Sequence, residues 1–333
     1  MNDPLGIKEV ESDLLCGPLH TATLCTRDIA GIRKFYVDGM GMELVGPIDL
    51  SEQQVKTQSS LWDIPKDITY DYYHLHRPSV PSLIQIRVLL LHQDTAHIHQ
   101  SYSSRELGPF SLGFPNANQK SLHKKLVEMD IEVMADMQTG EIPRADGTTY
   151  RYWETIFKGP DFLHCVGIER GDGMPPLSPV DESNQMGGPG YSAFVTNKST
   201  EELSFYVDVL GLELRADRYW ETSPGSALGI QEGVAYRFSL VYAPGSAQNH
   251  LLFLDYQDGI FEETGVAPRV PNIGLGMWSF QCTDLAVVLS KASAHNIKVI
   301  SGPSQYQDPI TGDAAYVTLL TPSGFLVEVF QTN

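Results

Sequence analysis

FYVDGMGMEL at residues 35–44 and FYVDVLGLEL at residues 205–214 agree at seven of ten positions. The two stretches lie 170 residues apart, which is about half of the 333-residue chain. A second similar pair, HKKLVEMDIEVM from His123 and LSKASAHNIKVI from Leu289, follows at a comparable offset. Self-similarity at a fixed offset is typical of an internal duplication. The sequence therefore predicts two homologous halves, each containing two smaller units.

Each half repeats the same order of predicted elements. LHTATLCT at 19–26 and GYSAFVTN at 190–197 alternate like strands, and a short helix follows each of them. The helix ends near Gly39 or Gly211, and three further strand signals complete a β-α-β-β-β unit. The chain is thus predicted to be of the α+β class, with units at about 17–95, 108–170, 188–257 and 272–331.

GDGMPPLSPVDESNQMGGPG, residues 171–190, separates the two halves. The stretch is rich in Pro, Gly and Ser and has few large apolar side chains, which is typical of a linker. We therefore predict an N-terminal domain over 1–170, with the first two units, and a C-terminal domain over 188–333, with the last two.

Composition limits the classes of partner. The 41 acidic residues exceed the 23 basic ones and give a net charge of −18, which repels nucleic acid and anionic lipid surfaces. The polar, acidic start of the chain does not resemble a secretory signal, and no apolar run of membrane-spanning length occurs in the sequence. We expect a folded cytoplasmic protein with a small-molecule partner, neither nucleic acid nor membrane; a homo-oligomer stays open.

The four cysteines, Cys16, Cys25, Cys165 and Cys282, lie far apart in the sequence and form no C-x-x-C pair. Neither a disulfide framework nor a zinc knuckle is therefore indicated. We interpret them as buried thiols.

The repeated unit resembles a known family. Tandem β-α-β-β-β units with F-Y-x-D-x-x-G-x-x-L after the first helix, and T-P-S-G-F-L-V-E near the end, are similar to the vicinal oxygen chelate superfamily. That superfamily includes glyoxalase I, bleomycin resistance proteins and extradiol dioxygenases. Four units at this length look most like the two-domain extradiol dioxygenases. The resemblance implies curved mixed sheets that enclose a concave pocket.

The resemblance also implies a divalent metal, iron or manganese, held by the first and last strands of paired units. Two of the family's histidines are missing here. The first-strand ligand position, counted back from the F-Y pair, is Tyr191 in the third unit, and the equivalent position in the fourth unit is Met277. An alternative ligand set is formed by His20, Gln85 and His164. His74 and His76 project from one strand face, which could hold a metal, and they are interpreted as lining a solvated or pocket face. The ligand set is incomplete, and a metal-free site stays open.

Glu328 in the preserved end motif is the predicted catalytic carboxylate. If Tyr191 lies beside it, burial would raise the carboxylate's pKa, and the tyrosine would donate to an oxyanion. The opposing interpretation is an inert core pair. The predicted substrate-binding residues are aromatic or apolar: Trp278, Met277, Phe253, Tyr219 and Trp220. R-Y-W-E-T also recurs at 151–155 and 218–222, where stacking on a substrate and half-buried strand positions are both open.

These residues favour an enzyme of the glyoxalase/extradiol dioxygenase superfamily. Its substrate would be oxygenated or aromatic, and its reaction ring cleavage, isomerisation or lyase chemistry at a degenerate or metal-free site. The alternative is a non-catalytic small-molecule binding protein of the bleomycin-resistance type. Metal content and turnover separate the two.

Overall fold

The computed structural model describes residues 14–134, 136–143, 147–223, 225 and 229–332. It contains the four predicted units, and each begins with a strand followed by a helix. The first unit consists of β1 (Cys16–Thr26), α1 (Ile29–Ile32) continued by a π-helix (Arg33–Gly39), β2 (Glu43–Ile48), α2 (Glu52–Leu61), β3 (Tyr70–His76) and β4 (Gln85–Leu91). The second consists of β5 (Gly108–Pro115), α3 (Gln119–Glu128), β6 (Gln138–Pro143), β7 (Thr149–Lys158), a 3-10 turn (Pro160–Phe162) and β8 (His164–Arg170).

The third and fourth units repeat the pattern. The third has β11 (Tyr191–Val195), α4 (Ser199–Ser204) with a π-helix (Phe205–Val209), β12 (Glu213–Trp220), β13 (Tyr236–Tyr242) and β14 (His250–Tyr256). The fourth has β15 (Gly274–Cys282), α5 (Leu285–Ala294), β16 (Lys298–Asp308), β17 (Gly312–Leu320) and β18 (Leu326–Thr332). The predicted linker carries a two-stranded ribbon, β9 (Val180–Asp181) with β10 (Met186–Gly187).

The repeated F-Y-V-D segments form equivalent π-helical turns in units one and three. Phe35 and Tyr36 are buried, as are Phe205 and Tyr206. The turns end at Gly41 and Gly211, whose φ values of 69° and 73° lie in the left-handed region that favours glycine. The seven shared positions therefore encode one structural element used twice.

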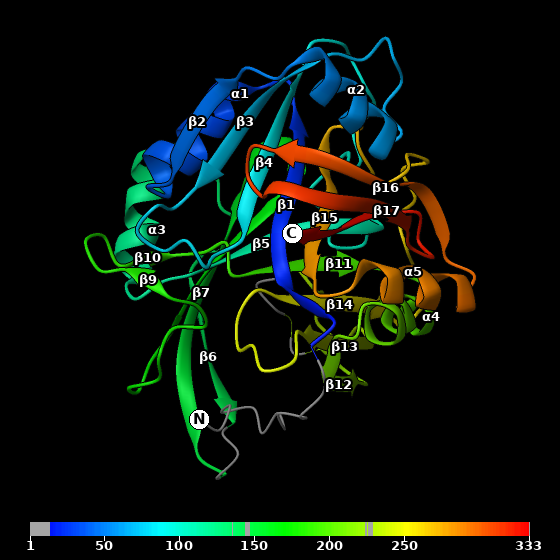
Figure 1. Cartoon of the computed structure of the whole chain (residues 1–333). Helices are drawn as coiled ribbons and strands as arrows, with labels where there is room; N and C mark the ends of the chain where they lie inside the picture. The colour runs from blue at the N-terminus through cyan, green and yellow to red at the C-terminus, as the bar shows by residue number, and fades with distance from the viewer. Residues whose placement is uncertain (1–13, 135, 144–146, 224, 226–228, 333) are drawn as a thin grey trace.

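The units pair differently from the predicted domains. The first sheet has the order β16-β17-β18-β15-β1-β4-β3-β2, and the second has the order β12-β13-β14-β11-β5-β8-β7-β6. Unit one thus shares a sheet with unit four, and unit two with unit three (Figure 1). The two units of each predicted domain therefore lie in different sheets, because β1 pairs antiparallel with β15, and β5 with β11. The chain boundary at the linker stays a prediction.

One apolar core joins the two sheets. Its members come from both sheets and from the helices, and they include Leu24, Val88, Phe114, Phe194 and Trp278, each fully buried. Burying one such side chain contributes roughly 1.5–3 kcal/mol, so this shared core ties the two sheets together. No helix within the described ranges is both long and apolar enough to cross a membrane.

The opposite face of the first sheet is covered by α2, an element added to the predicted unit between β2 and β3. Its N-terminus is a capping box, in which Ser51 and Gln54 satisfy each other's backbone N–H groups. The helix packs against β16, and Trp62 directly after it is fully buried. The end of this helix covers the face on which Glu328 lies, because Trp62 donates to its carboxylate.

Candidate functional site

The strand register of the first sheet brings Glu328 together with three polar side chains of the neighbouring strands. Thr21 on β1 lies opposite Ser279 on β15. Thr21 also lies beside Gln85 on β4, and Ser279 beside Glu328 on β18. Cross-strand partners project from the same side of a sheet, so these four side chains share one face. We call it the Arg87 face, after the residue at its centre.

Arg87 fills the centre of this face with a fully buried guanidinium. Its Nη1 lies 3.1 Å from Thr23 Oγ1 and 3.2 Å from Glu328 Oε1, and its Nη2 lies 3.1 Å from Asp308 Oδ2 and 3.2 Å from the same Glu328 oxygen. Its Nε donates to the Tyr72 hydroxyl at 3.1 Å. All three nitrogens are engaged, so the cation is held in one place.

Glu328 is satisfied on both oxygens. Besides Arg87, Ser279 Oγ donates to Oε1 at 2.8 Å, and Trp62 Nε1 donates to Oε2 at 2.6 Å. The Trp62 ring also lies 4.7 Å from the guanidinium carbon of Arg87. Burial by itself would lower the pKa of Arg87, but the charges of Asp308 and Glu328 raise it well above its ordinary value. The cluster is a closed, buried network of hydrogen bonds around the Arg87 cation.

The Arg87 face does not fit iron or manganese. A divalent ion on Glu328 would have to displace a guanidinium that lies 3.2 Å from the carboxylate and would meet its like charge. Of the neighbouring side chains, Thr21 and Ser279 offer only neutral hydroxyls, which are weak metal ligands. Gln85 Oε1 already accepts a hydrogen bond from His74 Nε2 at 2.8 Å. Among the residues that the structure describes, no group of three or more His, Cys, Asp or Glu side chains suits a metal.

The predicted metal set His20, Gln85 and His164 is not brought together. His164 lies on β8 of the second sheet, whereas the other two lie on the first. His20 Nδ1 lies 2.8 Å from Thr21 Oγ1, and its ring packs edge-on against Phe330. Burial lowers the pKa of His20 and of His164 to about 4 each. His74 and His76 stack on each other with ring centroids 4.3 Å apart.

Tyr191 and Glu328 lie on different sheets, so they do not form the predicted pair. The reason is topological: units three and four follow one another in sequence but contribute to separate sheets. Tyr191 lies opposite Gly113, and a Cβ at that glycine would come within 1.9 Å of the tyrosine ring. The ring therefore extends over β5 toward β8 and β7, and it stacks on His250 with centroids 5.1 Å apart.

The carboxylate near Tyr191 is Glu154, which the sequence reasoning missed. It lies on the same face of β7 as Tyr152 and Ile156, and Ile156 packs with Tyr191 in one cluster. Burial raises the pKa of the half-buried Glu154 to about 7. Burial, with the charge of Glu154 adding to it, also raises the pKa of Tyr191 well above its ordinary value. We call this side of the second sheet the Glu154 face.

The predicted substrate-binding residues are scattered. Trp278 and Phe253 are buried in the core between the sheets, and Met277 is buried on the Arg87 face. Tyr219 and Trp220 lie on edge strand β12 and are 63% and 41% exposed. These five residues therefore line no common site.

Two sequence signals pointed to the residues that were missed. Arg87 is a charge inside the apolar run IQIRVLLL, and a charge on a buried strand needs a charged partner. Glu154 lies within the repeated R-Y-W-E-T string, between aromatic and aliphatic residues of one strand face. Asp308 and Trp62 gave no comparable signal, because their roles depend on contacts across more than 200 residues.

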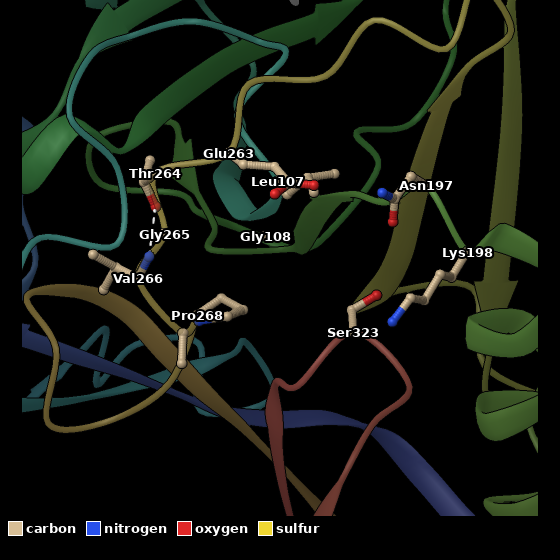
Figure 2. A pocket seen from close by; sticks show the side chains of 11 residues that line it. Leu107, Gly108, Asn197, Lys198, Glu263, Thr264, Gly265, Val266, Pro268 and Ser323 are labelled. Atoms are coloured by element: carbon tan, nitrogen blue, oxygen red, sulfur yellow. Dashed lines mark hydrogen bonds between the residues drawn. The ribbon is translucent and has the colours of Figure 1, made fainter.

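A separate cavity of about 310 Å³ lies outside both faces. Figure 2 shows Asn197, Lys198 and Ser323 along one side of it and Glu263 and Thr264 on the other. Lys198 Nζ donates to the Pro322 carbonyl at 2.9 Å, and most of the lining belongs to the loop before β15. The cavity is a surface hollow between units, and none of the predicted site residues lines it.

Comparison with known proteins agrees with this fold. Residues 189–329 match the model of the Glyoxalase/Bleomycin resistance protein/Dioxygenase superfamily. The chain therefore carries a domain of this superfamily, the vicinal oxygen chelate group. The matched segment spans units three and four, which lie in different sheets here. No curated protein sequence matches the chain significantly.

Solved structures resemble the whole chain. Glyoxalase I from Zea mays superposes with a TM-score of 0.60 at 12% identity, covering 94% of this chain and 92% of that one. A mutant of the same enzyme gives a TM-score of 0.64 at 11% identity, covering 94% and 92%. A dioxygenase-like protein from Bacillus subtilis gives 0.54 at 13% identity, covering 96% and 86%. At such identities the likeness shows the four-unit fold alone.

Proposed function

We propose that this chain is a small-molecule enzyme of the superfamily that uses the Glu154 face of the second sheet for proton transfer. The substrate class is an oxygenated or aromatic molecule, as the sequence predicts. The observation that carries the proposal is a half-buried carboxyl whose pKa is raised to about 7, on a face lined by aromatic rings. The superfamily contains enzymes, and the Arg87 face of this chain lacks a fitting metal-ligand set.

Glu154 has the properties of a general acid or base. Proton transfer by a side chain is most efficient when the pKa of that side chain lies near the working pH, because both of its protonation states are then populated. Desolvation is the cause of the shift, as expected for a carboxyl among Tyr152, Ile156 and Tyr191. Such a group supports abstraction of a proton next to a carbonyl, the step on which isomerisation and lyase reactions depend.

Tyr191 supplies the complementary hydrogen-bond donor. Its pKa is raised well above its ordinary value, so the phenol keeps its proton at neutral pH. A phenol next to the base can donate to the oxyanion that forms when the base removes a proton. Gly113 gives the ring its room, since any side chain there would clash with Tyr191. The proposed roles are thus Glu154 as base and Tyr191 as oxyanion donor.

The test uses 4-nitrocatechol, an aromatic diol whose absorbance reports whether it is ionised. The full chain, treated with a chelator, is titrated at pH 7, and the spectrum is followed for Glu154→Gln, Tyr191→Phe and the exposed control Glu128→Gln. We expect a spectral shift in the wild type and in Glu128→Gln, and its loss in Glu154→Gln. Binding without ionisation of the probe would favour the bleomycin-resistance alternative, and equal behaviour of all variants would refute the role of Glu154.

A further inference from the structure

Two of the four cysteines face each other across the strand pair that joins units one and four. Cys16 at the start of β1 is the register partner of Cys282 at the end of β15, although 266 residues separate them. The Thr283 amide donates to the Leu15 carbonyl at 2.9 Å, which makes the adjacent Cys16–Cys282 pair a non-hydrogen-bonded one. Side chains approach most closely at such pairs in antiparallel sheets.

The expected spacing suits a disulfide. Non-hydrogen-bonded partners have Cα atoms about 4.5 Å apart, and disulfides accept Cα separations of about 4.4–6.8 Å. Both thiols are free in the structure, and the charge on Cys282 contributes to the raised pKa of Cys16, after burial. The strand register thus places the two residues at a backbone spacing that a disulfide can span.

We propose that Cys16 and Cys282 are an oxidative modification site, at which a small peroxide converts the two thiols into an intrachain disulfide. The bond would link the first strand of unit one to the first strand of unit four and close a loop of most of the chain. The site is independent of the proposed function, because neither cysteine lies on the Arg87 or the Glu154 face: both pack in the core between the sheets.

The chemistry balances with hydrogen peroxide as the oxidant. Cys282, the more exposed of the two, attacks one peroxide oxygen as a thiolate. The O–O bond breaks, and a sulfenic acid forms on Cys282. The leaving hydroxide combines with the proton that the Cys282 thiol had released, and this gives the first water. The Cys16 thiolate then attacks that sulfur, the S–O bond breaks, and a second water leaves. The two sulfurs lose two electrons, and these reduce the peroxide.

Burial makes the reaction slow but gives it a distinct pH dependence. Burial is the largest cause that raises the pKa of Cys282, to about 11, so little thiolate exists at neutral pH. As long as the pH stays below that value, each increase of one pH unit should therefore raise the rate of disulfide formation about tenfold. A surface thiol with an ordinary pKa would instead level off near pH 9.

The other two cysteines provide matched controls. Cys25 is paired with Gly274 and Leu89, and Cys165 with Leu112 and Phe157, so neither faces a thiol across a strand. Both are fully buried, like Cys16. Their replacement by serine should leave the proposed disulfide intact, whereas replacement of Cys16 or Cys282 should abolish it.

The experiment treats the folded full chain with hydrogen peroxide at pH 8.5 and maps the peptides without reduction. We expect a cross-linked peptide pair containing Cys16 and Cys282, lighter by two hydrogen atoms, restored by dithiothreitol and retained in Cys25→Ser and Cys165→Ser. The oxidised protein should also unfold at a higher temperature than the reduced one.

Two results would overturn the proposal. One is oxygen addition at Cys282 without a cross-link in the folded wild type. The other is a cross-link that appears only after denaturation, which would show that the native strands hold the sulfurs apart. Because both outcomes are read on the wild type, the proposal stays testable even if Cys16→Ser fails to fold.

Discussion

The Glu328 carboxylate and the Arg87 guanidinium form a buried ion pair, in which both terminal nitrogens of the arginine lie 3.2 Å from Oε1 of the glutamate. In the family pattern this carboxylate belongs to a metal site. Here the positive charge that balances it is supplied by a side chain from β4 of the other unit in the sheet. The pair makes this face a structural element of the fold.

Arg87→Met should destabilise the protein strongly. Removal of one partner of a buried ion pair leaves uncompensated charge and costs about 3–5 kcal/mol. Glu328 and Asp308 would both lose their shared cation. Urea unfolding of Arg87→Met, Glu328→Gln and the double variant measures the coupling. We expect the double variant to lose less stability than the sum of the single ones; strict additivity would contradict a shared network.

Trp62→Phe should remove one hydrogen bond and keep most of the apolar packing. Its indole donates to Glu328 Oε2 at 2.6 Å, and a hydrogen bond to a charged group contributes about 1.5–3 kcal/mol. Denaturant unfolding should show a loss in that range. Trp153→Phe, at a partly exposed position on β7, serves as the control and should change stability much less.

Stability should fall on mild acidification. The pKa values of His20 and His164 are lowered to about 4, and that of His250 to about 3, chiefly by burial. Below pH 6.5 the folded state therefore binds fewer protons than the unfolded state, whose histidines titrate near 6.5. The contribution of these neutral histidines to the free energy of unfolding is fully present above pH 6.5 and is lost as the pH falls below it.

The size of this effect can be measured with His250→Phe. Each such histidine contributes a slope of about 1.4 kcal/mol per pH unit between roughly pH 6 and 4. The free energy of unfolding, measured from pH 7 to 5, should therefore depend less steeply on pH in His250→Phe than in the wild type. The exposed His295→Phe is the control, and an equal change in slope for both variants would argue against a buried neutral His250.

Glu154→Gln should stabilise the protein at alkaline pH. The folded-state pKa of about 7 lies above the ordinary value, so the native state loses stability as the pH rises toward and through 7. The amide carries no charge, so the variant should gain roughly 1–3 kcal/mol over the wild type at pH 8.5, and little at pH 4. Thermal unfolding at both pH values checks this, and a gain of equal size at pH 4 would rule out titration of Glu154 as its source.

Manganese should not stabilise the chain. A ligand that binds only the folded state raises the unfolding temperature by mass action, and Arg87 occupies the position beside Glu328 that a cation would need. We expect the same unfolding midpoint with a chelator and with added Mn²⁺ or Fe²⁺. A rise of several degrees with either ion would show that the Arg87 face opens to metal.

The sequence by itself determined the repeated unit. The F-Y-V-D turns and their glycines depend on local backbone geometry, so they were visible as matching letters at 35–44 and 205–214. The α+β class and the four units followed from the same local patterns, and the structure confirms them. Helix α2 was not predicted, although its capping box of Ser51 and Gln54 is a local sequence signal.

Only the tertiary structure decided which units share a sheet and which side chains meet. Strand pairing between β1 and β15 depends on contacts between residues that are far apart in sequence, and local periodicity does not encode it. That pairing separated Tyr191 from Glu328, gave Glu328 to Arg87 and placed Tyr191 near Glu154. The physical reason is that a buried charge needs a partner beside it in the folded sheet. The first sheet combines strands from both ends of the chain, so that partner is distant in sequence.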